Sequence, residues 1–295
     1  MPIALPSPQV LEITGADAVA FAHAQFASDV RALANRQWQW SAWLSAQGRV
    51  RAFFRVLRIG DEHLLLILQG GVAETLRAAL APFVFRAKVQ LRVVGTWQAI
   101  GFDRLVDVLD YLSAAPGPTD VVIANDRIGV ALPGPQPRWY VLGEALPATV
   151  DTSPAALNRW NAADVAAGIV EIGDAQVDRF LPSWLGLDEL GAVSVRKGCY
   201  PGQEIVARLH FKGGNKRWLQ QLDFSANVMP EVGTALTTDH DGGASGEVLR
   251  AAWTETGQGL VLAALPRLPA GVALMAPAMP GASFRVISTI GNPSD

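Results

Sequence analysis

The sequence predicts an α+β fold followed by a separate all-β domain. Over the first 217 residues, short apolar runs typical of strands alternate with segments of helical periodicity. After residue 218 the pattern changes to short strands separated by glycine and proline, which indicates a small antiparallel barrel or sandwich. At 295 residues the chain exceeds a usual single-core domain, so we expect two or three compact units.

The N-terminal region is predicted to form a strand at 10–13, a helix at 18–30 capped by Thr14 or Asp17, and strands at 38–44 and 49–59 around a turn at 45–48. The last strand has two distinct faces. Its alternating positions place Val50, Ala52, Phe54 and Val56 on one face and Arg49, Arg51, Phe53 and Arg55 on the other. We therefore expect one core face and one basic face that meets either solvent or a polar pocket.

The middle of the chain is predicted to contain a strand at 64–68, a helix at 72–81 stopped by Pro82, and strands at 89–94, 96–102 and 139–142. Ser153 as N-cap and Pro154 at the first helical position predict a helix that runs towards Gly168. In the C-terminal region we expect strands at 218–224, 245–253, 259–265 and 283–290, with a hairpin turn at 239–243.

Composition limits the function classes. Half of the residues are hydrophobic and 17% are charged, which suits substantial cores, and the net charge of −3 gives no general attraction to nucleic acid or to an anionic membrane. The single cysteine excludes an intramolecular disulfide and favours a reducing compartment. Because residues 1–6 contain neither a basic region nor a long apolar run, we expect a cytoplasmic protein without a membrane anchor.

Residues 196–208 carry the most unusual pattern. Two glycines and a proline within a few residues predict a tight loop, with a type II turn at Pro201-Gly202 and a helix that begins at Gln203. Cys199 lies just before that helix and beside Arg196 and Lys197, which are conditions that lower the pKa of a thiol. The alternative is a small buried cysteine without chemical function.

The same region is strongly basic. Between residues 196 and 217 there are six basic residues and one acid, Glu204, although the whole chain is acidic. This concentration of charge predicts a surface for an anionic ligand or partner. By contrast, the four histidines (His23, His63, His210 and His240) show no metal-ligand spacing among themselves or with Cys199, so we expect no metal site.

Residues 191–204 resemble the signature of the YgfZ family of folate-binding proteins, which is related to the T-protein of glycine cleavage. The specific part is Lys-Gly-Cys-Tyr-x-Gly-Gln-Glu at residues 197–204. Supporting matches lie at residues 13–17, 29–30, 47–50, 167–169, 180–182 and 215–217, so the resemblance covers roughly residues 8–290.

The resemblance implies an aminomethyltransferase-like cloverleaf of three domains around a central folate cavity. The first domain would comprise residues 1–45 and 152–217, the inserted second domain residues 46–151, and a C-terminal antiparallel β-barrel residues 218–295. The implied cofactor is tetrahydrofolate or a derivative. The implied function is support of the assembly or maintenance of iron–sulfur proteins, including enzymes that modify tRNA.

The resemblance also implies site residues. Cys199 would be the reactive thiol, with Lys197 and Tyr200 beside it. The folate would contact residues from three segments, namely Trp160, Gln203, Glu204, Arg49 and Arg51. From the sequence alone, Trp160 is better interpreted as a core residue, and the arginines are equally interpretable as a solvated strand face.

Two departures from the T-protein argue against aminomethyl transfer. Phe53 stands where the T-protein has an acid that assists folate chemistry, and Ala166 stands where another acid grips the pterin. Phenylalanine can neither hold a charge nor accept a proton, so we do not expect a classical enzyme. Two alternatives remain: a folate-dependent one-carbon transferase or demethylase, and a scaffold that binds a protein partner or, less favoured, tRNA through its basic surface.

Overall fold

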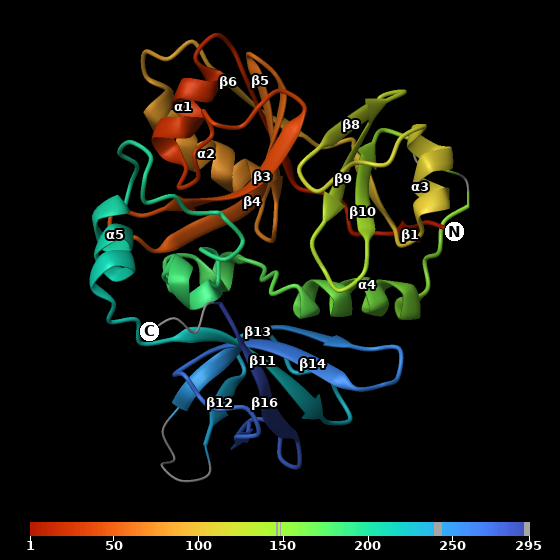
Figure 1. Ribbon diagram of the computed structural model, residues 1–295, viewed down its shortest axis with the longest axis vertical. Coiled ribbons are helices and arrows are strands. Elements are labelled where there is room, and N and C mark those ends of the chain that lie inside the picture. Colours follow the sequence, from red (N-terminus) through yellow and green to blue (C-terminus); the bar gives the residue numbers. More distant parts are fainter. Residues whose placement is uncertain (146, 148, 239–243, 292–295) are drawn as a thin grey trace.

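The computed structural model describes residues 1–145, 147, 149–238 and 244–291, and three antiparallel sheets organise this part of the chain (Figure 1). The turn predicted at 239–243 lies outside the described residues. No helix within the described ranges is both long and apolar enough to cross a lipid bilayer.

The first sheet has the order β3-β4-β5-β2-β6. Its strands are β2 (Val10–Thr14), β3 (Gln37–Leu44), β4 (Val50–Gly60), β5 (His63–Leu68) and β6 (Gln90–Val94). Helices α1 (Ala18–Gln25) and α2 (Ala73–Val84) pack on one of its faces. The strands and the turn at 45–48 agree with the sequence prediction.

The second sheet has the order β1-β7-β10-β9-β8, from β1 (Ile3–Ala4), β7 (Gln98–Phe102), β8 (Val121–Ala124), β9 (Arg127–Leu132) and β10 (Arg138–Gly143). Helix α3 (Leu105–Leu112) packs on it. Helix α4 (Pro154–Ala166) lies between this sheet and the third one (Figure 1). As predicted, Ser153 caps α4: its hydroxyl accepts a hydrogen bond from the amide of Ala156 at 3.2 Å.

The third sheet confirms the predicted C-terminal barrel. Its order is β12-β13-β14-β11-β16-β15, from β11 (Trp218–Ser225), β12 (Ala235–Thr237), β13 (Ala244–Trp253), β14 (Gly259–Leu265), β15 (Ala273–Leu274) and β16 (Ser283–Ile290). An isolated bridge between Thr237 and Met275 joins its two edges, so the sheet is nearly closed. The segment before it contains the short 3-10 helices η1 (Asp174–Gln176) and η2 (Pro182–Leu185), and helix α5 (Gln203–Lys212).

Two predicted helix ends differ from the structure. α1 ends at Gln25 rather than near residue 30, because Phe26 is extended and forms a β-bridge with Trp43. α2 continues through Pro82 to Val84. A proline in the last turn removes only one amide donor, so the helix tolerates it there.

Strand β4 is buried on both faces, which corrects the expectation of a basic, polar face. Phe54 and Val56 belong to the core under α1 and α2, whereas Phe53 and Leu57 belong to the central core shared with the second sheet. Arg55, on the supposedly polar face, is only 3% exposed. The sequence could not show this because the covering residues come from the second sheet.

The division into domains at 1–45 plus 152–217, 46–151 and 218–295 stays a prediction. Strands β3 and β4 pair along their length across the expected boundary at residue 45. That pairing favours a boundary outside the hairpin of residues 37–60.

Candidate functional site

The loop before α5 presents Cys199 to solvent, while the residue after it is buried. Cys199 is exposed and Tyr200 is 6% exposed. The Tyr200 hydroxyl donates a hydrogen bond to the carbonyl oxygen of Ser194 at 3.0 Å and thereby closes the loop. Burial raises the pKa of Tyr200, and the nearby Asp188 raises it further. The phenol is therefore held neutral and acts as an anchor for the loop.

Lys197 ties this loop to the end of α1. Its ammonium donates hydrogen bonds to the carbonyl oxygens of His23, Phe26 (2.5 Å) and Ser28 (3.1 Å), and it lies 4.9 Å from the ring centroid of Tyr200. Burial lowers the pKa of Lys197 from 10.5 to about 8. The lysine of the motif is thus buried beneath the loop and does not contribute to an exposed basic surface.

His23 is a neighbour of the loop that sequence reasoning missed. Its Nε2 lies 3.9 Å from the place that a Cβ on Gly198 would take, and its Nδ1 lies 3.2 Å from a carboxylate oxygen of Asp29. Burial, and then the charge of Lys197, lower the pKa of His23. No spacing pattern in the sequence connects position 23 with position 198.

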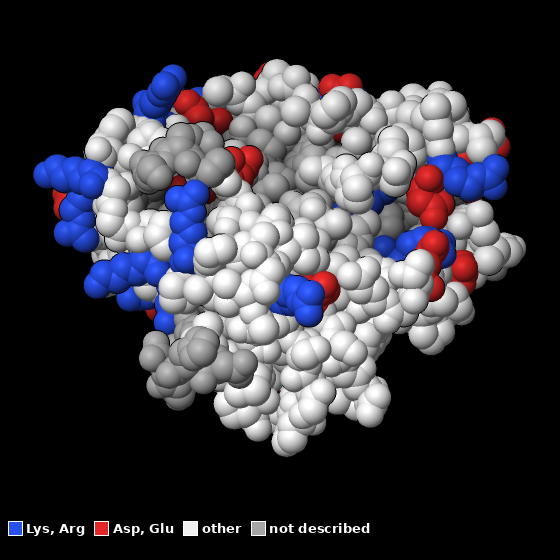
Figure 2. Space-filling view, turned by 60° about the horizontal axis from the view of Figure 1, so that its bottom comes forward, with Lys and Arg blue, Asp and Glu red and all other residues white. Residues whose placement is uncertain are grey.

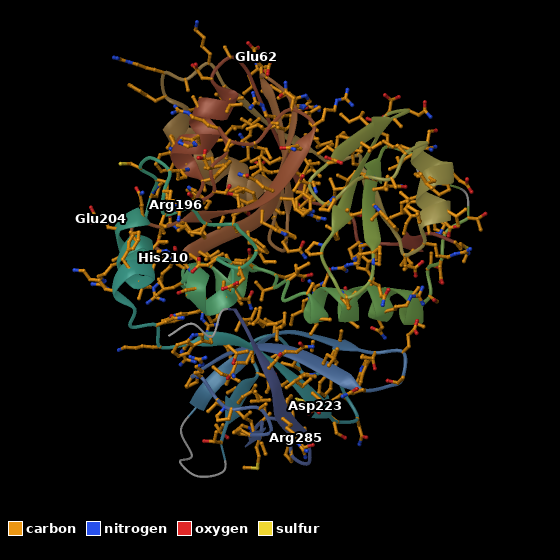
Figure 3. The ribbon with its side chains drawn as sticks, in the orientation of Figure 1. Glu62, Arg196, Glu204, His210, Asp223 and Arg285 are labelled. Atoms are coloured by element: carbon orange, nitrogen blue, oxygen red, sulfur yellow. The ribbon has the colours of Figure 1, made fainter. Side chains whose placement is uncertain are left out.

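The turn after Cys199 has the predicted geometry. Gly202 has φ +79°, as position three of a type II turn requires, and α5 begins at Gln203. A Cβ on Gly202 would lie 2.5 Å from the carbonyl oxygen of Ser45 and 2.6 Å from the Cα of Gly48. Gln203 donates to the carbonyl oxygen of Lys197 at 3.2 Å. Glu204 is exposed on the outer side of α5 (Figure 3).

A cavity of about 690 Å³ lies between β3 of the first sheet and the turn that joins β9 to β10 in the second. Trp38 and Trp40 line one side, and Arg138 and Trp139 line another. Its remaining walls come from the 116–119 and 133–137 segments and from residues 189–191. Its volume and its flat aromatic walls are those of a site for a planar organic molecule.

Arg55 is a buried cation beside this cavity. Its guanidinium carbon lies 5.6 Å from the ring centroid of the cavity-lining Trp40 and 4.1 Å from that of Tyr140. Within the described part of the chain, its Nε and Nη1 have no hydrogen-bond partner. Burial lowers the pKa of Arg55. Arg55 is 3% exposed and is not part of the described lining, so its charge acts on the cavity from behind the Trp40 wall.

Three of the residues predicted to hold folate, Trp160, Arg49 and Arg51, contact other parts of the protein. Trp160 is 6% exposed and lies against the backbone of Gly101, where a Cβ would come within 2.4 Å of its ring. Arg49 donates to the carbonyl oxygen of Arg179, and Arg51 pairs with Asp178 at 3.0 Å. The described lining of the 690 Å³ cavity includes neither these residues nor Cys199.

Phe53, which the sequence resemblance places at an acid of the T-protein, is fully buried. Its ring stacks on that of Trp40, with 4.8 Å between centroids and 22° between planes. An apolar ring thus supports the cavity wall from behind, and position 53 supplies no proton acceptor.

A buried ionic network connects α4 with both neighbouring sheets. The carboxylate of Asp164 lies 2.5 Å from Arg138 Nη2 and 2.8 Å from Arg250 Nη2. The three side chains are 6%, 3% and 9% exposed, respectively. Because Arg138 belongs to β10 and Arg250 to β13, one carboxylate holds three parts of the fold together. Charged residues 112 positions apart gave no sequence signal for this network.

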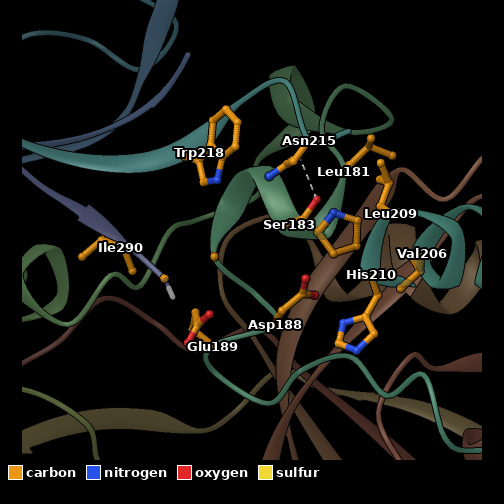
Figure 4. A pocket seen from close by; sticks show the side chains of 13 residues that line it. Leu181, Ser183, Asp188, Glu189, Val206, Leu209, His210, Asn215, Trp218 and Ile290 are labelled. Carbon is orange, nitrogen blue, oxygen red and sulfur yellow. Dashed lines mark hydrogen bonds between the residues drawn. The ribbon is translucent and has the colours of Figure 1, made fainter. Parts of the chain in front are cut away.

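A second cavity, of about 370 Å³, lies behind α5 (Figure 4). Asp188, His210 and Trp218 line it, and Ser183 donates a hydrogen bond to Asn215 at 3.3 Å in its wall. Burial raises the pKa of Asp188, and nearby His210 opposes that shift. The apolar face of α5, with Val206 and Leu209, forms the wall of this cavity on the side of the helix.

Comparisons with known proteins agree with this geometry. No family model matches the chain. A protein of Escherichia coli strain K12 named tRNA-modifying protein YgfZ is 30% identical over 264 residues, which cover 84% of this chain and 80% of the relative. Its counterpart in the O157:H7 strain EC4115 shows the same identity and coverage.

Among solved structures, the aminomethyltransferase T of the glycine cleavage system from Bartonella henselae superposes with a TM-score of 0.74. The match covers 97% of this chain and 84% of that one at 14% sequence identity. It therefore shows the fold, and it confirms the aminomethyltransferase-like architecture expected from the sequence.

Proposed function

The chain belongs to the YgfZ family, and on that premise we propose that it is a folate-binding accessory protein that supports iron–sulfur proteins through Cys199. The clients would include enzymes that modify tRNA, since the relatives are named tRNA-modifying proteins. The proposed ligand is tetrahydrofolate or a derivative.

The observation that carries the ligand proposal is the 690 Å³ cavity between the first two sheets. The indole rings of Trp38 and Trp40 offer a flat apolar wall for a pterin, and Arg138, paired with Asp164, adds a polar group to the lining. Arg55 packs on Trp40 outside the described lining, and its buried charge would attract the anionic groups of a folate through that wall. Apolar walls with a few convergent polar groups are typical of cofactor sites.

The proposed chemistry lies with Cys199. An exposed thiol on a loop fixed by Lys197 and Tyr200 can reach a partner without a rearrangement of the core. Its thiolate can attack the outer sulfur of a persulfide on the partner, which forms the persulfide on Cys199 and releases the partner's thiolate, or it can contact a cluster that the partner holds. With a single cysteine, the chain itself cannot supply a four-thiolate cluster site.

Ligand binding is tested by calorimetric titration of the full chain with tetrahydrofolate in the absence of oxygen. Arg55→Met removes a buried cation behind the Trp40 wall, which should weaken binding of an anionic ligand by about 1 kcal/mol, roughly fivefold in Kd. Trp40→Leu should weaken binding by about 1 kcal/mol, roughly fivefold. Trp253→Leu, in the barrel and packed on Phe224, is the matched control and should bind like the wild type.

Arg55→Met has a second readout that separates a ligand role from a structural one. Because the variant removes a buried cation without a full set of partners, the free protein should be at least as stable as the wild type. Loss of both stability and binding would assign Arg55 to the fold alone. Absence of any binding heat at 0.1 mM wild-type protein, a concentration of the order used for weak ligands, would refute the folate proposal.

The accessory role is tested in a bacterial strain that lacks its own YgfZ relative. The wild-type chain should restore thiomethylated nucleosides in tRNA, as measured by mass spectrometry, and Cys199→Ser should not. Since Cys199 is outside the lining of the cavity, the variant should keep its affinity for tetrahydrofolate. Full restoration by Cys199→Ser would refute the proposed role of the thiol.

A further inference from the structure

The outward face of α5 combines exposed cations with an exposed aromatic ring. Arg208, Phe211 and Lys212 follow one another at helical spacing on this face. Arg196 in the loop before the helix and Lys216 after it are exposed as well. Together these five residues are called the α5 surface. In Figure 2, Lys and Arg side chains gather at the left edge of the molecule, on the side where α5 lies in Figure 1.

The cations of the α5 surface are not used inside the protein. Among the described residues, none of its four cationic side chains has a carboxylate within 4.0 Å. Elsewhere, exposed arginines such as Arg77, Arg92 and Arg179 pair with a neighbouring acid. On a chain of net charge −3, a group of unpaired cations creates a local positive potential that attracts an anionic partner.

Phe211 distinguishes this surface from ordinary solvated charge. Its side chain is 71% exposed, and its ring contacts that of His210 edge-on at 4.9 Å. Aromatic rings and arginines are enriched at the centre of protein–protein interfaces, and Phe211 and Arg208 provide both. The opposite face of the helix carries the buried Val206 and faces the 370 Å³ cavity, so Phe211 lies on the side turned away from the protein.

We propose that the α5 surface docks an acidic surface of a partner protein and thereby places that partner over Cys199. The inference rests on the proposed function and specifies the chemistry of the partner: carboxylates opposite Arg196, Arg208, Lys212 and Lys216, around an apolar pocket for Phe211. Cys199 lies four residues before the first residue of α5 and is itself exposed, so a docked partner reaches the thiol.

The charge pattern favours a protein over an RNA. Glu204 is exposed on the same face as Arg208 and repels a phosphate backbone, whereas a protein partner can oppose it with a lysine or arginine. α5 has 10 residues. It is therefore only about 15 Å long, which offers few phosphate contacts. The overall negative charge of the chain adds long-range repulsion towards a polyanion.

The test places a photoreactive p-benzoylphenylalanine at position 211 of the full chain in the complemented strain described above. The same residue at position 85 is the matched control, because Phe85 is 86% exposed on another part of the surface. The expected result is an adduct to an acidic protein from position 211 that resists ribonuclease and does not form from position 85. Arg208→Glu combined with Lys212→Glu should reduce its yield at least tenfold.

A second crosslinker attached to Cys199 should capture the same protein, which ties the docking surface to the thiol. An adduct that ribonuclease removes, equal adducts from positions 211 and 85, or a yield unchanged by the charge reversal would each overturn the proposal. Titration of the charge-reversed variant with tetrahydrofolate separates the two proposals. Lost adduct with retained folate affinity supports the docking surface, whereas retained adduct without folate binding overturns the ligand proposal alone.

Discussion

Removal of the buried carboxylate of Asp164 should destabilise the protein more than removal of any exposed acid. Asp164→Ala leaves the guanidinium groups of Arg138 and Arg250 buried without the acid that lies 2.5 and 2.8 Å from them. Loss of one partner from a buried pair costs about 3–5 kcal/mol. The two pairs share a single acid, so their costs do not add.

The remaining contacts place the expected loss at the lower end of that range. Arg250 keeps Glu171 at 3.0 Å, and Arg138 keeps the carbonyl oxygens of Pro133 and Trp160. We therefore expect the free energy of unfolding to fall by about 3 kcal/mol. With a urea m-value of about 3 kcal/mol/M, the midpoint should fall by about 1 M.

The assay is urea unfolding followed by tryptophan fluorescence and, independently, by circular dichroism. Asp178→Asn is the matched control, because asparagine also tolerates the left-handed backbone of residue 178 (φ +59°): the partner Arg51 is at 3.0 Å, but the Asp178 and Arg51 side chains are 41% and 38% exposed. Such an exposed pair is worth about 0–1 kcal/mol. A midpoint for Asp164→Ala within about 0.3 M of the control, on the same m-value, would show that the network does not hold the fold together.

Three further predictions concern the Cys199 loop and the packing of α4. Because the folded pKa of Lys197 is about 8 rather than 10.5, the unfolded chain binds more protons between these values, so stability should rise with pH across that window. NMR titration of the four methylated lysines should show one transition near pH 8 that disappears in Lys197→Met. A transition above pH 10 for this lysine would contradict the reasoning. Gly101→Ala places a Cβ 2.4 Å from the ring of Trp160, so it should cost about 1–3 kcal/mol in urea unfolding. The loss in the double variant with Trp160→Leu should be smaller than the sum of the two single losses, and strict additivity would show that the two residues do not conflict. The exposed Cys199 should react stoichiometrically with dithiobis(nitrobenzoate) in the native protein. Cys199→Ser should change the free energy of unfolding by less than about 0.5 kcal/mol. A thiol that reacts only in urea would contradict the exposure of Cys199.

Local patterns in the sequence predicted most of the strands and the turn at Gly202. Alternation predicts β4, a short apolar run predicts β5, and the Pro201-Gly202 pair predicts the start of α5. The early end of α1 was not predictable in this way. Residues 26–30 keep helical periodicity, but a tertiary bridge from Phe26 to Trp43 draws the chain into an extended form.

The candidate site was predicted only in part because its walls come from distant segments. The motif correctly indicated a tight loop with Cys199. The number of basic residues in this region suggested that Lys197 belongs to an exposed surface. In the structure Lys197 is buried, and its ammonium donates to carbonyl oxygens of the segment after α1. Trp38 and Trp40 gave no signal as cavity residues, since the opposite wall begins at residue 116. The sequence places Arg55 at a polar strand position, but in the structure Tyr140 of β10 covers its guanidinium.

The contact between Gly202 and the hairpin at Gly48 has a mechanical consequence. Neither glycine leaves room for a side chain: a Cβ on Gly202 would lie 2.6 Å from the Cα of Gly48, and a Cβ on Gly48 would lie 2.9 Å from the Cβ of Ile205 and 3.3 Å from the carbonyl oxygen of Gly202. The two backbone segments are therefore in direct contact, with no side chain between them. Since β3, which carries Trp38 and Trp40, runs into that hairpin, the strand of the cavity wall and the segment that bears the thiol are in direct backbone contact through these two glycines.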